Sequence, residues 1–246
     1  MLTYRKYCLF QLNADPEIQE NLFQLFKEIL NPALTRAEFQ SYLFKMCPCD
    51  IFLLLVYDGD KAVGFCFAGF YPFLVNKKNV YVARVALGLQ DRYRGRNLPL
   101  STFFMGFLRF KLSHPGAEIV LMNFVLNPIV YRMTHEYSAR AYPREKGTTP
   151  PFLLELKNKI LERMGLKENV RDSLLVNTPF RVVQSPEQVS RFEKSANKLI
   201  QEFLRMNPAY NHQTGVLMLV PVNTRNLLHA IGTAMRKKNR KVTRML

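Results

Sequence analysis

The chain has 246 residues, of which 48% are hydrophobic and 22% charged, and these proportions exclude a largely disordered protein. Lys and Arg together number 35 against 19 Asp and Glu, which leaves a net charge of +16. A field of that sign disfavours polycationic substrates and favours acidic or phosphate-rich partners. The sequence contains no uninterrupted apolar stretch of membrane-spanning length and no signal-peptide pattern at its start, so we expect a cytoplasmic protein.

The four cysteines do not have the pattern of a disulfide framework or of a zinc site. Cys47 and Cys49 are separated by one residue rather than the two of a typical zinc knuckle, and no cluster of histidines lies nearby. Cys8 and Cys66 stand alone. We therefore expect reduced thiols and no metal centre.

The first part of the chain predicts the element order β-α-α-β-β-β-α-β-α. Asp15 followed by Pro16 has the pattern of a helix start, and Thr35 with Glu38 has the spacing of a capping box. Asp58-Gly59 between two β-rich runs predicts a hairpin, and Gly88 suggests a bulge. The expected strands are 4–12, 51–57, a run that begins at 62, 79–89 and 117–124, and the expected helices are 15–30, 35–46, 98–112 and 128–137.

After Tyr142-Pro143 the pattern loosens, and the prediction is a core over 1–145 with an extension over 146–246 that completes the sheet and adds helices. The last residues, 236–246, form a basic tail that we expect to be frayed and solvated. The expected helices of the extension are 151–164, 186–206 and 224–237, and its expected strands are 173–176, 180–183 and 216–222.

The most informative segment is LGLQDRYRGRNLPLSTF, residues 87–103. A strand ends there, a short loop follows, and a helix begins. The first N–H groups of a helix have no intrahelical partner and carry partial positive charge. Arg92, Arg94 and Arg96 add guanidinium groups, and Gly95 allows close approach of the backbone, so a pyrophosphate would fit. The alternative interpretation is a solvated turn between two buried elements.

The order of elements and this loop resemble the GNAT N-acyltransferases, whose loop pattern is Gln/Arg-x-x-Gly-x-Gly/Ala. Arg94 takes the first position, Asn97 stands at the first glycine and Pro99 at the second small residue. A second register would place Arg92, Gly95 and Asn97 on the pattern. The resemblance implies an α/β fold with a mixed, mostly antiparallel central sheet flanked by helices.

The resemblance also implies a cofactor, acetyl-CoA or another acyl-CoA. The backbone amides from Arg94 to Leu100 would then hold the pyrophosphate. Leu87 and Leu89 would hydrogen-bond the pantetheine as an added strand, and the Leu89 amide would polarise the thioester carbonyl. The expected cofactor-binding residues are Leu87, Leu89, Arg92, Arg94, Gly95, Arg96, Asn97, Leu98, Leu100 and Asn127.

In many members of that family a tyrosine about two turns after an asparagine protonates the departing thiolate. Here Asn123 or Asn127 would be the asparagine and Tyr131 the catalytic acid. The alternative interpretation is that Tyr131 packs a helix face and Asn127 caps the helix. No general base is identified, although three side chains stand in the expected stretch. These are Glu118, His135 and Glu136.

Two functions from different classes follow. The first is an acyl-CoA-dependent N-acyltransferase, with an unidentified amine as acceptor. The second is a catalytically inactive GNAT-like binding protein whose basic surface docks an acidic partner, which could be nucleic acid, anionic lipid or an acidic protein. Asn97 and Pro99 at the family's glycine positions keep the second hypothesis open.

Overall fold

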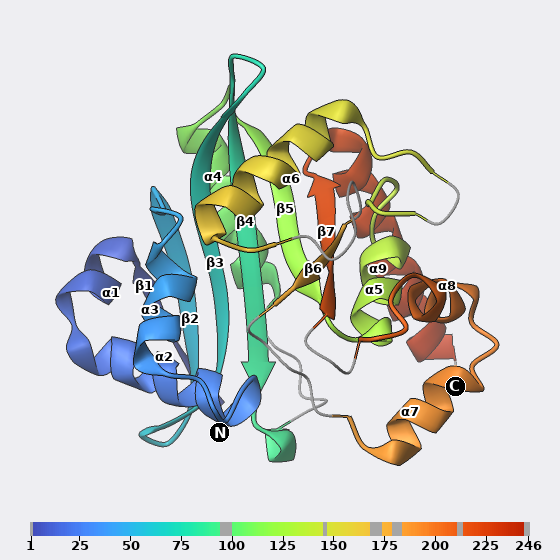
Figure 1. The fold of residues 1–246 in the computed structure, drawn as a ribbon. Coiled ribbons are helices and arrows are strands. Elements are labelled where there is room, and N and C mark those ends of the chain that lie inside the picture. Colours follow the sequence, from blue (N-terminus) through green and yellow to red (C-terminus); the bar gives the residue numbers. More distant parts are fainter. Residues whose placement is uncertain are drawn as a thin grey trace. The chain divides into compact units, whose positions relative to one another are not determined.

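The computed structural model of the chain describes residues 2–93, 100–144, 147–167, 174–178, 184–210 and 214–243, with the side chains of 100–105 and 237–243 outside the description. Figure 1 shows the strands and helices coloured along the sequence. The chain divides into two compact units, Met1–Glu118 and Ile119–Leu246. The prediction of a core that ends near residue 145 stays a prediction.

The first unit is built on four antiparallel strands in the order of the sequence. They are β1 (Leu2–Cys8), β2 (Asp50–Asp58), β3 (Lys61–Val75) and β4 (Lys78–Leu89). The expected hairpin at Asp58-Gly59 is confirmed, with Gly59 at a φ of 61°. The second hairpin turns at Asn76 and Lys77, which also have positive φ.

Helices cover both faces of these strands. The helices of the unit are α1 (Leu9–Ala14), α2 (Pro16–Ile29), α3 (Arg36–Phe44) and α4 (Leu100–Ser113). Phe26 of α2 stacks on Phe65 of β3 at 4.6 Å between ring centroids. Phe110 of α4 stacks on Phe70 of β3 at 3.9 Å. Because odd and even residues of a strand point to opposite faces, α2 and α4 pack on opposite sides of β3.

The second unit has three antiparallel strands in the order β5-β7-β6. Its core contains Tyr131, Phe203, Val216 and Met218, all at most 1% exposed. The strands are β5 (Glu118–Val125), β6 (Leu175–Asn177) and β7 (Thr214–Pro221), and the helices are α5 (Pro128–Glu136), α6 (Pro151–Met164), α7 (Pro186–Glu193), α8 (Lys198–Met206) and α9 (Thr224–Thr243).

The expected fold class is confirmed: the chain is an α/β protein whose strands are mostly antiparallel and are flanked by helices. The two sequence-predicted caps are also confirmed. The Asp15 carboxylate accepts from the N–H groups of Glu17 and Ile18, and Thr35 and Glu38 form the reciprocal capping box.

Several predictions of local structure were wrong. The strand expected over 4–12 ends at Cys8, because the Gln11 side chain accepts from the Cys8 N–H at 3.0 Å and starts helix α1. The helix expected over 186–206 is two helices, since Asn197 caps a new one and accepts from Leu199 and Ile200. The tail expected to fray continues helix α9 to Thr243.

Gly88 was expected to mark a bulge, and the β3–β4 register runs through it without interruption. A Cβ at Gly88 would lie 2.7 Å from Cγ2 of Ile29, so this glycine lets α2 approach β4. The register shift lies elsewhere, between Val56 and Tyr57 of β2. The strand expected over 180–183 falls outside the described residues. Among those that are described, no helix combines the length and apolarity needed to cross a bilayer.

Candidate functional site

The end of β4 presents main-chain groups on the side away from β3. The Gln90 N–H donates to the Val63 carbonyl at 3.0 Å, so Val63 and Gln90 form a hydrogen-bonded pair. Hydrogen-bonded and non-hydrogen-bonded pairs alternate along antiparallel strands. In the continuous register, Leu89 opposite Gly64 and Leu87 opposite Cys66 are therefore non-hydrogen-bonded pairs. Their N–H and C=O groups point away from β3.

The turn after β4 is held by side chains at its base. Tyr93 is buried, and its hydroxyl donates to the Asp58 carboxylate at 2.6 Å. The Gln90 amide donates to Glu28 at 2.7 Å. Arg92 is exposed, and its guanidinium lies 4.6 Å from the centre of the Tyr93 ring. The chain therefore leaves β4 in a fixed direction with one arginine already at the surface.

The expected phosphate loop lies mostly outside the described residues. This holds for Arg94, Gly95, Arg96, Asn97 and Leu98. Helix α4 follows, and among the described residues it begins at Leu100, whose side chain is not described. The pyrophosphate site at this loop stays a prediction.

Asn127 caps helix α5. Its side-chain oxygen accepts from the Ile129 N–H at 2.8 Å, in the position before Pro128. It also lines a cavity of about 420 Å³ together with Arg191 of α7. The capping interpretation of Asn127 is thus present in the structure, and a cofactor contact stays a prediction.

Tyr131 lies one turn into α5 with its ring fully buried against Phe203 of α8. Its hydroxyl donates to Oε1 of Glu202 at 2.6 Å and lies 3.4 Å from the Pro143 carbonyl oxygen. A phenol that donates to a carboxylate at this distance forms a strong, charge-assisted hydrogen bond. The sequence pattern pointed to Tyr131 and missed Glu202, which is 71 residues away along the chain and belongs to no motif.

His135 lies one turn beyond Tyr131, with the two ring centroids 4.4 Å apart. It is 8% exposed, and its Nε2 atom has no hydrogen-bond partner in the described part of the chain. Burial lowers the pKa of His135 from 6.5 to about 4, and the Arg144 charge acts in the same direction, whereas Glu202 and the Pro143 carbonyl oppose the shift. The imidazole is therefore neutral at neutral pH.

The other two candidates for a base are engaged in surface ion pairs. Glu118 lies 3.5 Å from the Lys78 ammonium, and Glu136 lies 3.4 Å from Arg132 one turn earlier in α5. His135 is thus the candidate among the three that is buried and uncharged. Burial also raises the pKa of the Cys66 thiol to about 12, which agrees with a structural rather than a nucleophilic cysteine.

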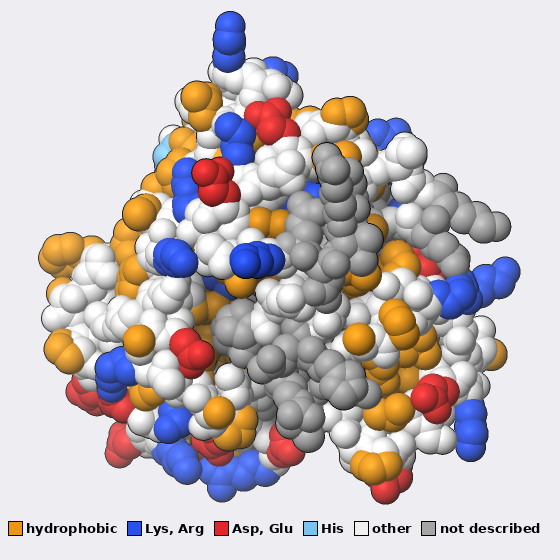
Figure 2. All heavy atoms as spheres, viewed as in Figure 1, with side chains coloured by type: hydrophobic (Ala, Val, Ile, Leu, Met, Phe, Trp, Pro, Cys, Tyr) orange, Lys and Arg blue, Asp and Glu red, His pale blue; other side chains and the backbone are white. Residues whose placement is uncertain are grey.

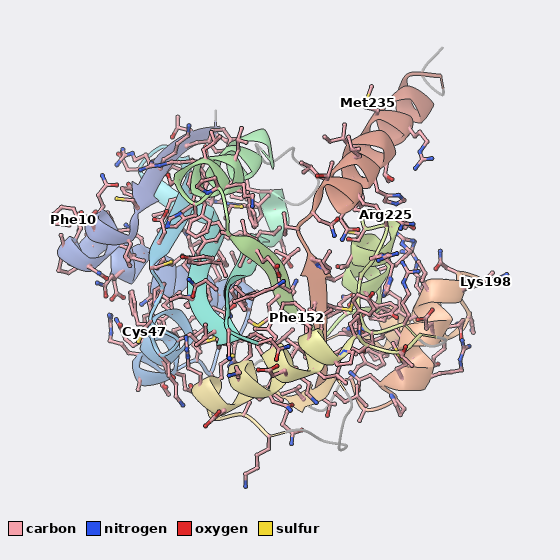
Figure 3. The ribbon with its side chains drawn as sticks, turned by 90° about the horizontal axis from the view of Figure 1, so that it is seen from above. Phe10, Cys47, Phe152, Lys198, Arg225 and Met235 are labelled. Carbon is pink, nitrogen blue, oxygen red and sulfur yellow. The ribbon has the colours of Figure 1, made fainter. Side chains whose placement is uncertain are left out.

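A cavity of about 740 Å³ opens beside these groups within the second unit. It combines one carboxylate and one neutral imidazole, which can accept protons or hydrogen bonds, with three cationic side chains. Lys198, at the start of α8, is labelled in Figure 3. The lining residues are His135, Arg144, Ser195, Ala196, Lys198, Leu199, Gln201, Glu202 and Arg205.

The wall of this cavity at Ser195 is shaped by Gln201. Its amide nitrogen lies within hydrogen-bond distance of the carbonyl oxygens of Phe192, Glu193 and Ser195, at 3.2, 3.0 and 2.9 Å. This contact fixes the break between α7 and α8 and leaves Ser195 at the cavity. Within the described ranges, no group of three or more His, Cys, Asp or Glu side chains could hold a metal ion.

No family model matches the sequence, and no curated protein matches it. Solved structures do resemble the chain in fold. A putative acetyltransferase of the GNAT family and an N-acetyltransferase are among them. The likeness to these structures is a similarity in the path of the chain alone.

Three of these structures illustrate the similarity. NAA60 of Arabidopsis thaliana, solved with acetyl-CoA, is 12% identical, with 91% of this chain and 99% of that chain covered and a TM-score of 0.41. The ribosomal-protein-S18-alanine N-acetyltransferase of Escherichia coli is 8% identical, with 91% and 96% covered and a TM-score of 0.40. A putative GNAT acetyltransferase of Desulfovibrio desulfuricans is 9% identical, with 69% and 87% covered and a TM-score of 0.33.

Proposed function

We propose that the protein is an acyl-CoA-dependent N-acyltransferase that moves an acyl group, acetyl in the simplest case, from coenzyme A to an amine by direct attack. The observation that carries this proposal is the direction of the main-chain groups of Leu87 and Leu89, which point away from β3 at the end of β4. Three residues after Leu89, at Arg92, an arginine-rich segment begins that leads to helix α4.

Each part of coenzyme A has a counterpart in this stretch. The two amides of the pantetheine arm would pair with Leu87 and Leu89 as an added strand, as extended peptides do on exposed strand edges. The Leu89 N–H would donate to the thioester carbonyl and stabilise the oxyanion that forms on attack. The first turn of α4, with Arg92, Arg94 and Arg96, would bind the pyrophosphate.

The proton transfers are proposed for Tyr131 and Glu202. The attacking amine forms the C–N bond as the C–S bond breaks, and the thiolate takes a proton from the Tyr131 hydroxyl. Glu202, which accepts a hydrogen bond from that hydroxyl, would return a proton to Tyr131. Glu202 in turn takes its proton from the acceptor ammonium, which must lose one proton before it attacks and another afterwards. One proton is therefore released per turnover.

The cavity beside Glu202 is proposed to receive the acceptor amine. The Glu202 carboxylate and the neutral His135 ring can both accept from an ammonium group. The three cations that line the same cavity favour an acceptor that also carries an anionic group. Polyamines are disfavoured for the same reason.

Calorimetric titration with coenzyme A tests the cofactor. We expect the protein to bind coenzyme A, and the double variant Arg94→Glu/Gly95→Val to lose binding while its circular dichroism spectrum is unchanged. Lys61→Glu, which reverses one exposed charge in the β2–β3 hairpin of the same unit, is the matched control and should bind normally. A protein that ignores coenzyme A at millimolar concentration contradicts the proposal.

Thiol release from acetyl-CoA over a panel of small amines and peptides tests catalysis. Turnover with any acceptor supports the acyltransferase. Binding of coenzyme A without thiol release on the whole panel favours the alternative, a GNAT-like scaffold that docks an acidic partner through its basic surface.

A further inference from the structure

Helix α9 packs on its unit through polar side chains. Asn226, 6% exposed, donates to the carbonyls of Arg140 and Pro221 and accepts from the Arg140 N–H at 2.8 Å. His229 Nε2 lies 3.1 Å from the Glu136 carbonyl oxygen, and the Thr233 hydroxyl lies 3.4 Å from the same atom. These three residues recur at spacings of three and four, so they form one side of the helix.

The opposite side of α9 carries apolar side chains that face solvent. Leu227 and Leu228 are 37% and 64% exposed, Ile231 is 45% exposed and Met235 is 62% exposed. By helical geometry these four residues form a stripe roughly half a turn away from Asn226 and Thr233. We call these four residues the apolar stripe. An amphipathic helix of a globular protein normally buries its apolar side, so α9 has the reverse arrangement.

The charged residues of α9 are all basic. Arg225 and Arg236 are exposed, and Figure 3 shows α9 with Arg225 and Met235 labelled along it. No Asp or Glu follows Glu202 in the sequence. The later turns of the helix add four more cationic residues. These are Lys237, Lys238, Arg240 and Lys241.

The combination of the apolar stripe with cationic residues distinguishes the possible binding partners of α9 by their chemistry. A second copy of α9 would bring two acid-free basic helices together, and like charges would oppose that pairing. A nucleic acid would match the cations, and it would leave the apolar stripe in water. An anionic bilayer matches both, because its phosphates attract the cations while the acyl boundary takes the apolar side chains.

We propose that α9 is an interfacial membrane anchor that lies on anionic lipid surfaces, with the apolar stripe inserted below the headgroups. Single exposed apolar side chains are common at the surface of this protein, and Figure 2 shows them beside charged residues on another part of the molecule. The apolar stripe differs because four of them share one side of one basic helix. This inference does not depend on the proposed catalytic activity.

The sequence contains no tryptophan, so a single introduced one reports on its own surroundings. We expect the Leu228→Trp variant to show a blue-shifted emission with vesicles of phosphatidylcholine and phosphatidylserine and no shift with phosphatidylcholine alone. Leu112→Trp is the matched control, since Leu112 is an exposed leucine at 72% on helix α4 of the other unit. Its emission should be unchanged by either vesicle.

Co-sedimentation of the full chain with the same vesicles gives the affinity. We expect Leu228→Gln/Ile231→Gln to weaken partitioning about tenfold or more, because apolar surface no longer enters the bilayer. Leu108→Gln/Leu112→Gln, which changes two exposed leucines one turn apart on α4, should partition like the unaltered protein. Arg236→Glu/Lys237→Glu should also weaken partitioning about tenfold or more by charge alone.

Two results would overturn the proposal. One is equal partitioning of the unaltered protein to vesicles with and without phosphatidylserine. The other is unchanged partitioning of Leu228→Gln/Ile231→Gln, which would leave only a charge attraction that any basic segment can provide. The six substituted positions in these variants lie on helices α4 and α9 and not in strands. They are 108, 112, 228, 231, 236 and 237. Circular dichroism should therefore show that every variant folds.

Discussion

At the scale of single residues, the hydrogen bond between Tyr131 and Glu202 connects helices α5 and α8. Tyr131 has a structural role and a proposed catalytic role. The Tyr131 ring is part of the core of its unit, and its hydroxyl reaches a carboxylate that lines a cavity. A purely structural tyrosine needs only the ring and a satisfied hydroxyl. A catalytic one must also pass a proton, so removal of the hydroxyl separates the two roles.

We expect Tyr131→Phe to lower kcat for acyl transfer about tenfold to a hundredfold, with little change in KM for acyl-CoA. The free energy of unfolding should fall by about 1–2 kcal/mol, because Glu202 loses a hydrogen bond. Tyr71→Phe is the matched control: this tyrosine is equally buried and donates to the Leu43 carbonyl at 3.0 Å in the other unit. It should lose similar stability and keep kcat.

The lowered pKa of His135 predicts how the free energy of unfolding depends on pH. Its pKa is about 4 in the folded chain and close to 6.5 when unfolded, so the unfolded chain takes up a proton as pH falls below 6.5 while the folded chain does not until about pH 4. The contribution of His135 to the free energy of unfolding is complete above pH 6.5 and declines between pH 6.5 and 4. At pH 5.5 we expect a loss of about 1 kcal/mol relative to pH 7.5.

Denaturant unfolding at the two pH values measures this loss. His135→Phe keeps a ring beside Tyr131 and cannot take up a proton, so it should lack that part of the decline. His114→Phe, which leaves His135 in place, should retain it. An identical decline in His135→Phe and the unaltered protein would mean that other groups cause it.

At the scale of elements, two helical glycines have opposite surroundings. A Cβ at Gly106 of α4 would lie 2.9 Å from the Phe52 ring of β2, whereas a Cβ at Gly232 of α9 would meet nothing within 4 Å. Gly106 thus lets α4 pack closely on the sheet of its unit. The start of that helix is the proposed phosphate site, so the packing at Gly106 also positions the site.

The same substitution should therefore have opposite signs at the two sites. We expect Gly106→Ala to lower the free energy of unfolding by about 1 kcal/mol through overpacking and to weaken binding of coenzyme A. Gly232→Ala should raise the free energy of unfolding by about 0.5–1 kcal/mol through helix propensity and leave binding unchanged. Thermal unfolding with and without coenzyme A measures both. A stabilising Gly106→Ala would show that α4 can move away from Phe52 at no cost.

The elements that the sequence predicted well are those whose signals are local. The caps at Asp15 and Thr35 and the turn at Gly59 depend on residues within four positions of each other. Helix α6 was also predicted with the bounds Pro151–Met164, since a proline starts it and Gly165, with a φ of 67°, follows it.

Two features that the sequence analysis missed depend on side-chain contacts that apolar periodicity does not reveal. The break between α7 and α8 needs Gln201 to reach back to three carbonyls around Glu193, and apolar periodicity continues through it. Glu202 lacks any local signal because its partner, Tyr131, lies on another helix. Of the candidate site, the sequence thus indicated Tyr131 and the end of β4, while the cavity and its carboxylate required the folded unit.

At the scale of the whole molecule, the net charge of +16 attracts any phosphate compound, so specific binding must be separated from that attraction. We expect coenzyme A at about 100 times its Kd to stabilise the protein by about 2.7 kcal/mol, which raises Tm by about 5–10 °C. Pantetheine lacks the pyrophosphate and ATP lacks the pantetheine arm, so each should give a smaller shift at equal concentration. Scanning calorimetry provides the comparison. A shift with ATP equal to that with coenzyme A would indicate charge attraction alone.

The contact between α2 and β4 gives the proposed ligand site a neighbouring reporter. Ile29 rests on Gly88, and Glu28 accepts from Gln90, so the last turn of α2 is fastened to the strand end on both sides of Leu89. Any small displacement of that strand end will alter the magnetic environment of the Ile29 methyl groups. An isotope label on this one isoleucine can therefore register events at the strand end without a probe at Leu87 or Leu89.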